Sequence, residues 1–357
     1  MNVAAALDAQ PRFALARLPT PLHEAPHLRT ALGGPERCPR IFIKRDDLTD
    51  LALGGNKARK LEFLVADALR ARATVLITTG AVQSNHARMT AAAARRAGMR
   101  AVLVLTSPAG PADLQGNLLL DRILGAEVHI IDGGAHTVAS AADREAQTIA
   151  AISAQLVRAG DRPYVVALGG SCGIGTLGYV DCTREMLEQL QSLGVAPTHL
   201  YYASGSRGTQ AGLELGVHAF QAPWRCTGIA VSGGEVEKRE RAADIANAAA
   251  GRLGLDVRID VADLVTDQDH YGDGYAIPTA AGIEAMQLLA AAEAILLDPV
   301  YTAKAMAGLI AHIRRGRLGP DDTVLFLHTG GVPGLFGAAP VIVPLLRADP
   351  AAPRSLL

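Results

Sequence analysis

The sequence predicts an α/β fold with parallel sheets, and three observations support this. Short β-rich runs alternate with longer, alanine-rich amphipathic runs along most of the chain. Several of the β-rich runs are continuously apolar, as expected for parallel strands that are covered on both faces. Clusters of glycine and polar residues follow the strand ends, where open α/β sheets bind their ligands.

Eight strands and nine helices are predicted in this alternation. The strands are expected over residues 41–45, 74–80, 101–105, 127–131, 163–168, 199–204, 227–233 and 323–330. The helices are expected over 56–72, 84–97, 114–124, 137–158, 174–192, 208–219, 235–253, 279–291 and 302–315. No repeat period is visible, and the Pro/Ala-rich C-terminus is expected to fray.

The composition narrows the class of protein. The 357 residues suggest about two domains and a sizeable core, and 49% of them are hydrophobic. Lys and Arg number 34 against 35 Asp and Glu, so no basic field exists to attract nucleic acid or anionic lipid. No signal peptide and no apolar run long enough for a membrane span is found, so a cytoplasmic location is expected. The four cysteines form no CxxC pair and no metal-binding pattern, and they are interpreted as free thiols.

The segment ASGSRGTQAG (203–212) follows a predicted strand and opens a predicted helix. Its glycines allow backbone N–H groups to face a ligand, its hydroxyls add donors, and the helix N-terminus favours an anion. The candidate phosphate-binding residues are Ser204, Gly205, Ser206, Gly208 and Thr209. The spacing fits neither a Walker A motif nor a dinucleotide fingerprint, and an ordinary glycine-rich turn is an equal alternative on spacing alone.

Lys57 lies at the predicted start of a helix, directly after GGN. The positive end of the helix dipole there disfavours a protonated ammonium and favours the neutral amine that covalent catalysis needs. A lone lysine is more often a solvated surface charge, and Lys60 is expected to be such a residue.

Two further strand ends carry candidate residues. In QSNH, Ser84, Asn85 and His86 place several donors at a predicted helix start, which suits a carboxylate, although Ser84 or Asn85 is equally a helix cap. His86 taken alone is interpreted as a structural histidine rather than a base. Thr329 in HTGG ends the last predicted strand and can direct a hydroxyl into a site, or simply belong to a turn.

Together these segments resemble the D-cysteine desulfhydrase, L-cysteate sulfo-lyase and 1-aminocyclopropane-1-carboxylate (ACC) deaminase family of fold-type II enzymes that use pyridoxal 5'-phosphate (PLP). The resemblance runs from about residue 20 to 336. It is strongest in IKRDDLTDLALGGNKARKLEFLVADAL, GAVQSNHARMTAAAA, GYAIPTAAGIEAM and LLDPVYTAKAMAGLI.

The resemblance implies a role for each candidate. Lys57 matches the PLP lysine, the loop from Ser204 to Thr209 matches the phosphate site, and Thr329 matches the partner of the pyridine nitrogen. Asn85 is expected against the ring hydroxyl. Ser84, with the amides of Asn85 and His86, is expected to hold the substrate carboxylate. The remaining substrate-facing residues are Tyr275, Tyr301, Ser171 and Cys172.

The implied activity is β-elimination from a small sulfur-containing amino acid, D-cysteine or L-cysteate, to give pyruvate and ammonia. A hydroxyl at Thr329 makes the ring a moderate electron sink, which suits early loss of a good leaving group, with Lys57 as the base. ACC deaminases typically have QSNQ, and a glutamate where this chain has Thr302, so the sequence favours the sulfur-eliminating relatives. The alternatives are ACC deaminase and a chloroalanine dehydrochlorinase-like eliminase.

Two departures from the family bear on the substrate. Arg207 lies inside the phosphate loop, where it is free to pair with the phosphate, point to solvent, or reach a sulfonate. Cys172 replaces the Asn or Ser of many relatives, or is simply a small buried hydrophobe.

The resemblance also implies the domain organisation. Residues 54–169 are expected to form a small domain carrying the PLP lysine and the QSNH segment, and residues 1–53 with 170–357 a large one. A homodimer is expected. A non-catalytic PLP-binding or amino-acid-binding paralogue is disfavoured because Lys57 and both tyrosines are present. A nicotinamide-dependent oxidoreductase is disfavoured because no GxGxxG follows an early strand.

Overall fold

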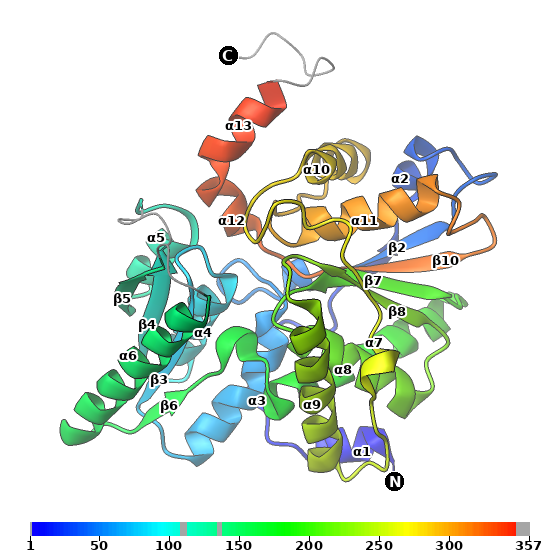
Figure 1. Ribbon diagram of the computed structural model, residues 1–357. Coiled ribbons are helices and arrows are strands. Elements are labelled where there is room, and N and C mark those ends of the chain that lie inside the picture. The colour runs from blue at the N-terminus through cyan, green and yellow to red at the C-terminus, as the bar shows by residue number, and fades with distance from the viewer. Residues whose placement is uncertain (1, 108–112, 134–137, 348–357) are drawn as a thin grey trace.

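The chain folds around two sheets that lie beside each other (Figure 1). A computed structural model describes residues 2–107, 113–133 and 138–347. The α/β class with mainly parallel sheets is confirmed, because β1 is the one strand that pairs antiparallel among the strands of the described residues. No helix within those residues is both long and apolar enough to cross a membrane.

The larger sheet combines strands from both ends of the sequence. Its order is β1 (Leu22–Glu24), β2 (Arg40–Arg45), β10 (Thr323–His328), β7 (His199–Ser204), β8 (Arg225–Ala230) and β9 (Thr266–Asp267). The early strand β2 therefore lies directly beside the late strand β10, with Ile41 opposite Val324 and Ile43 opposite Phe326.

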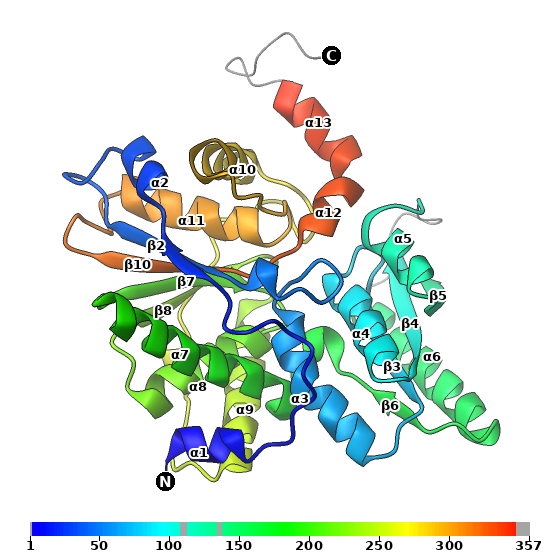
Figure 2. The same ribbon diagram turned by 180° about the vertical axis from the view of Figure 1, so that it is seen from behind.

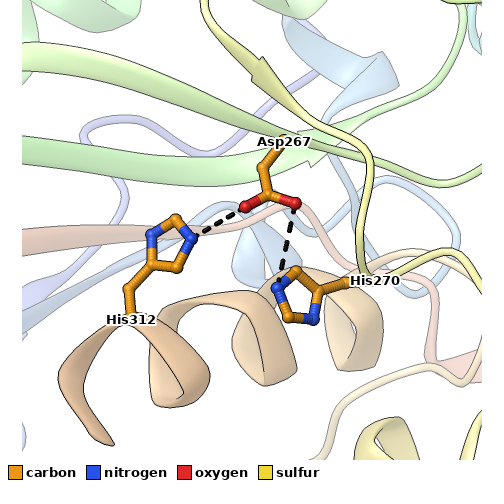
Figure 3. Close-up of side chains that lie close together, drawn as sticks. All are labelled: Asp267, His270 and His312. Atoms are coloured by element: carbon orange, nitrogen blue, oxygen red, sulfur yellow. Dashed lines mark hydrogen bonds and ion pairs between the residues drawn. The ribbon is translucent and has the colours of Figure 1, made fainter. Parts of the chain in front are cut away.

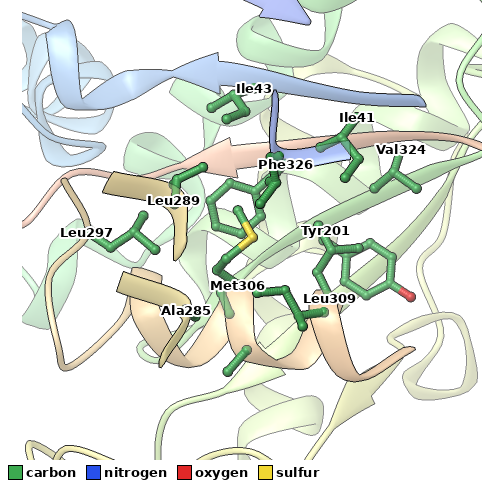
Figure 4. Packing of buried hydrophobic residues seen from close by; sticks show 14 of the residues in the cluster. Ile41, Ile43, Tyr201, Ala285, Leu289, Leu297, Met306, Leu309, Val324 and Phe326 are labelled. Atoms are coloured by element: carbon green, nitrogen blue, oxygen red, sulfur yellow. The ribbon is translucent and has the colours of Figure 1, made fainter. Parts of the chain in front are cut away.

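Helices cover both faces of the larger sheet. The helices α2 (Pro26–Ala31), α10 (Ala280–Glu293) and α11 (Thr302–Arg314) lie on one face, and α7 (Gly173–Leu193) and α8 (Gly208–Phe220) on the other, with α9 (Glu235–Leu253) outside them (Figures 1 and 2). On the first face Met306 and Leu309 of α11 pack against Phe326 and its neighbours (Figure 4). This buried contact fixes α11 on the sheet.

The smaller sheet is parallel throughout. Its order is β5 (Glu127–Asp132), β4 (Arg100–Ser107), β3 (Val75–Ala81) and β6 (Pro163–Val165). The helices α3 (Lys57–Arg70), α4 (Asn85–Arg96) and α5 (Gly116–Ile123) accompany it on one side and α6 (Val138–Arg158) on the other. Helix α3 also packs against α7, so it joins the two sheets.

The structure departs from the predicted elements at short segments. The predicted strand 163–168 stops at Val165, and Leu168–Gly170 form a 3-10 turn in which Gly169 and Gly170 have positive φ. The sequence prediction also missed the short elements: helices α1 (Val3–Asp8), α2, α12 (Val332–Gly337) and α13 (Ala339–Arg347), and strands β1 and β9. Segments of two to nine residues are too short for a periodic pattern to stand out.

The predicted start of α6 at residue 137 lies outside the described residues. All four strands of the smaller sheet come from residues 75–165, and the larger sheet uses strands on both sides of that stretch. The domain boundaries at 54 and 169 stay a prediction.

Candidate functional site

A cavity of about 320 Å³ lies where the carboxyl ends of strands from both sheets meet. Four strands contribute residues at or just beyond their last position: Gly80 and Ala81 at the end of β3, Ser204 at the end of β7, Val231 after β8 and Thr329 after β10. This is the position that parallel α/β sheets reserve for ligands. The cavity also takes residues from the starts of α3 and α4 and from the segments that carry Leu168, Lys238, Tyr275 and Tyr301.

Lys57 opens α3 and lines the cavity. Its Nζ donates to Asn56 Oδ1 (2.8 Å), and Asn56 Nδ2 donates to Thr209 Oγ1 (3.1 Å), which joins the lysine to the glycine-rich loop. Burial, and then the charge of Arg88, lowers the pKa of Lys57 to about 8, while Asp298 opposes the shift. The amine is therefore neutral far more often than an ordinary lysine, with burial rather than the helix dipole as the first cause.

The loop from Ser204 to Thr209 joins β7 to α8 as predicted. Gly205, Ser206 and Thr209 line the cavity, whereas Gly208 lies behind it. The Ser204 hydroxyl is engaged locally, since it donates to Gln210 Oε1 (2.6 Å) and accepts from Arg207 Nη1 (3.0 Å). The loop thus presents backbone N–H groups at the start of α8, which is an arrangement that binds anions.

Lys60 corrects the sequence prediction, because it is not a surface residue. Its side chain is fully buried, and its Nζ donates to Gly169 O (3.2 Å). A Cβ built on Gly208 would lie 2.9 Å from Lys60 Nζ, so the amine lies directly behind the glycine-rich loop. Burial, followed by the charge of Lys57, holds the pKa of Lys60 well below its usual value. An anion in the loop would supply the negative charge that this buried group lacks.

The start of α4 carries Ser84, Asn85 and His86 into the cavity. Ser84 is the helix N-cap, and its Oγ accepts from Ala87 N (3.2 Å). The carbonyl oxygen of the Asn85 side chain accepts from Asn117 Nδ2 (3.0 Å). This contact orients the Asn85 amide so that its N–H group is available to the cavity.

His86 is a buried, neutral histidine. Thr78 Oγ1 donates its one proton to Val166 O (2.8 Å), so the 2.9 Å contact with His86 Nε2 must be donated by the imidazole. Burial, and then the charges of Lys57 and Lys60, keeps the pKa of His86 well below 6.5. The sequence interpretation of His86 as a structural histidine rather than a base agrees with these contacts.

Two tyrosines face each other in the cavity. The hydroxyls of Tyr275 and Tyr301 are hydrogen bonded to each other. Burial is the first cause that raises the pKa of both phenols, so both stay protonated at neutral pH. Asp298 holds Tyr301 in place, since its carboxylate accepts from the backbone N–H groups of Val300, Tyr301 and Thr302 at 2.8–2.9 Å.

Ser171 and Cys172 are not among the residues that line the cavity, and their role in substrate binding stays a prediction. Ser171 instead supports the loop from behind, because its Oγ donates to Ser206 Oγ (2.8 Å) and accepts from Gly208 N (3.2 Å). Cys172 precedes α7 and packs against the apolar core beside α3 and α4. Leu168 and Gly169, which precede these two residues in the chain, do line the cavity.

The guanidinium of Arg207 does not point to solvent. Arg207 is 2% exposed, and its guanidinium is paired with Glu235 and donates to Gln210 Oε1 (2.7 Å) and Thr266 Oγ1 (3.1 Å). Its φ of 73° places it in the left-handed region at the start of α8. These contacts join the loop to α9 and to β9. They already engage the guanidinium, for which the sequence had left a phosphate or a sulfonate open as a partner.

Among the residues that sequence reasoning missed are Asn56, which lines the cavity, and Lys60 and Asp298, which support the residues that line it. Lys60 follows Lys57 by three positions and thus lies on the same face of α3, which was a usable signal. Asn56 acts through its contact with Thr209, 153 residues later, of which the sequence carries no local sign, whereas Asp298 acts on the residues that directly follow it.

Comparisons with known proteins agree with this geometry. A family model described as pyridoxal-phosphate dependent enzyme matches residues 14–330. A D-cysteine desulfhydrase of Salmonella choleraesuis (strain SC-B67) is 43% identical over 335 residues, covering 92% of this chain and 97% of that protein. The crystal structure of an ACC deaminase homologue is 37% identical with a TM-score of 0.86 and covers 96% of this chain and 99% of its own. A diaminopropionate ammonia lyase from Escherichia coli shares the fold at 16% identity, with a TM-score of 0.63 over 93% of this chain and 89% of that one.

Proposed function

Because the chain belongs to the pyridoxal-phosphate dependent enzymes, we propose that it is a carbon–sulfur lyase that converts D-cysteine and water to pyruvate, ammonia and hydrogen sulfide. The observation that carries the proposal is Lys57, a partly buried lysine whose pKa is lowered to about 8, in a cavity that also holds an anion-binding loop. The similarity to a D-cysteine desulfhydrase over nearly the whole chain supports this choice of substrate.

The cavity fits the cofactor. The loop from Gly205 to Thr209, with the buried Lys60 behind it, would hold the phosphate. Lys57 would hold the cofactor covalently, the Asn85 amide would donate to the ring hydroxyl, and the Thr329 hydroxyl would face the ring nitrogen. When bound, PLP withdraws electrons from the substrate Cα.

The remaining residues act on the substrate. The backbone amides of Asn85 and His86 at the start of α4, with Ser84, would bind the substrate carboxylate. Lys57, once displaced by the substrate amine, would accept the Cα proton at its Nζ. The Tyr275 and Tyr301 phenols stay protonated, so one of them would donate its proton to the leaving sulfur as the Cβ–S bond breaks.

Product analysis tests the proposal. The purified protein is offered D-cysteine, L-cysteine, L-cysteate and ACC in parallel, and pyruvate, sulfide, sulfite and 2-oxobutanoate are quantified. We expect pyruvate and sulfide from D-cysteine at the highest kcat/KM. Pyruvate and sulfite from L-cysteate alone would make the protein an L-cysteate sulfo-lyase. 2-Oxobutanoate from ACC alone would refute the carbon–sulfur lyase and favour the activity in the name of the ACC deaminase homologue.

The Gly208→Ala variant tests the phosphate site. An added Cβ would lie 2.7 Å from Ser171 Oγ and 2.9 Å from Lys60 Nζ, so the support behind the loop must move. We expect the affinity of the apoprotein for PLP, measured by absorbance titration, to fall about tenfold or more. In the control Gly251→Ala the added Cβ meets nothing within 4 Å, and the affinity should not change. Equal affinities in the two variants would place the phosphate elsewhere.

A homodimer and a cytoplasmic location stay predictions from the sequence. Gel filtration or light scattering of the purified protein would test the first of these.

A further inference from the structure

The segment that brings Tyr275 to the cavity, residues 268–279 between β9 and α10, has no helix or strand of its own. Gly272 and Ala276 have φ of 67° and 63°, so the backbone turns sharply on both sides of Tyr275. Tyr275 itself is 43% exposed, although its hydroxyl contacts Tyr301 inside the cavity. Something outside the segment must therefore hold the tyrosine at its position.

Lys304 holds the backbone of this segment. Its side chain is fully buried, and its Nζ donates to Tyr271 O (2.7 Å) and Gly274 O (2.9 Å). The second of these carbonyls belongs to the residue immediately before Tyr275. Burial lowers the pKa of Lys304, and the charge of Asp298 opposes that shift. The two carbonyl oxygens at Nζ are the kind of ligand that a cation accepts.

The helix that carries Lys304, α11, is held in place by its packing in the core. Met306 and Leu309 anchor α11 in the core of the larger sheet (Figure 4). Tyr301 immediately precedes α11, one turn before Lys304. One rigid helix start therefore sets the position of Tyr301 directly and, through Lys304, that of Tyr275.

We propose that Lys304 is a positioning residue for the reaction, a built-in cation that clamps the carbonyls of Tyr271 and Gly274 and thereby places the Tyr275 hydroxyl against Tyr301. The two carbonyls then form a monovalent cation site that the lysine side chain occupies. The role in the reaction rests on the proposed function, since it requires the tyrosines to act on the substrate. The cation site itself does not depend on that function.

A second anchor lies at the beginning of the same segment (Figure 3). Asp267 Oδ2 accepts from His312 Nε2 (2.7 Å), and Asp267 Oδ1 lies 3.8 Å from His270 Nε2. These three residues have the composition of a metal site. However, Arg317 Nη1 lies 3.0 Å from His312 Nε2 and 4.0 Å from Asp267 Oδ2, so a guanidinium already supplies the positive charge. The cluster holds Asp267 beside α11. The backbone next to Tyr275 is held by Lys304.

Removal and replacement of the cation test the proposal. Lys304→Ala leaves the two carbonyls without a donor and opens space for a small ion, whereas Lys304→Met removes the charge and keeps the side-chain volume. We expect both variants to lose about tenfold or more in kcat on D-cysteine with a smaller change in KM. Ammonium or potassium at about 0.1 M should restore kcat several-fold in Lys304→Ala, with lithium less effective, and should leave Lys304→Met and the wild type unchanged.

Two further measurements separate this role from simple destabilisation and from the proposed activity. Ammonium should raise the Tm of the Lys304→Ala apoprotein and not that of the wild type, because an ion that binds only the folded state stabilises it. In a Tyr275→Phe background, Lys304→Met should cost much less activity than it does alone. Absence of any ion effect on Tm would overturn the cation site even in an inactive protein, and full additivity with Tyr275→Phe would overturn the positioning role.

Discussion

Replacement of Lys57 by alanine is expected to abolish both the yellow colour of the purified protein and its release of pyruvate. Lys57 would supply the covalent attachment to the cofactor and also the base for the Cα proton, so one substitution removes two contributions. General base catalysis alone contributes about 10²- to 10⁴-fold, and loss of the covalent attachment adds to that. We therefore expect pyruvate release to fall by about 10³-fold or more, measured under saturating PLP.

A matched control is available in the same cavity. Lys238 also lines the cavity, but its Nζ is bound to Ser232 Oγ (2.7 Å) rather than to the glycine-rich loop. Lys238→Ala should keep its absorbance band from covalently held PLP, whereas Lys57→Ala should not. A Lys57→Ala protein that keeps the band, or more than about a tenth of the wild-type rate, would show that another amine holds the cofactor.

The position of the site could be predicted from the sequence for a simple reason. Parallel strands present their carboxyl ends at one edge, so polar clusters that each follow a strand must meet there. The segments around Lys57, Asn85, Ser206 and Thr329, far apart in the sequence, accordingly line one cavity. The long strands and helices were predicted for a related reason, since each spans enough residues for its periodicity to be visible.

The contacts behind the site could not be predicted in the same way. A lysine gives no local sign of whether it is buried, and Lys60 and Lys304 are both fully buried because of segments distant in the chain. Ser171 was assigned to the substrate from the family resemblance, and the turn formed by Gly169 and Gly170 directs it behind the phosphate loop. Arg207 depends on Glu235, which lies 28 residues later.

Arg59, two residues after Lys57 on α3, lies at the centre of a buried charge network. Its guanidinium is fully buried and donates to both carboxylate oxygens of Asp46 (2.8 Å each) and to both of Glu185 (2.9 Å each). Lys44 pairs with Glu185 from the other side. The backbone carbonyl of Asp46 in turn accepts a hydrogen bond from Gly55 N (3.1 Å). The network therefore also supports the turn that precedes Lys57.

The Arg59→Met variant is expected to lose about 3–5 kcal/mol of unfolding free energy, because it leaves Asp46 and part of Glu185 buried without their counter-charge. Urea unfolding of the apoprotein at pH 7 measures this loss. The control is Arg314→Met, which breaks the half-exposed pair with Glu284 and should cost about 1 kcal/mol or less. Equal losses in the two variants would mean that the buried network contributes no more than a surface pair.

The same network predicts a pH dependence with a definite sign. Although burial alone would raise the pKa of Glu185, the hydrogen bonds and charges of Arg59 and Lys44 lower it to about 2, against an ordinary value of 4.5. A carboxyl whose pKa is lower in the folded state stabilises the fold above its unfolded pKa and loses that contribution as pH falls. Glu185 should therefore contribute about 3 kcal/mol of unfolding free energy above pH 4.5, and this contribution is lost progressively as pH falls towards 2.

Because Arg59 is the first source of the lowered pKa, the Arg59→Met protein should lose less unfolding free energy than the wild type between pH 5 and 3. Parallel losses in the two proteins over that interval would assign the acid sensitivity to other carboxylates.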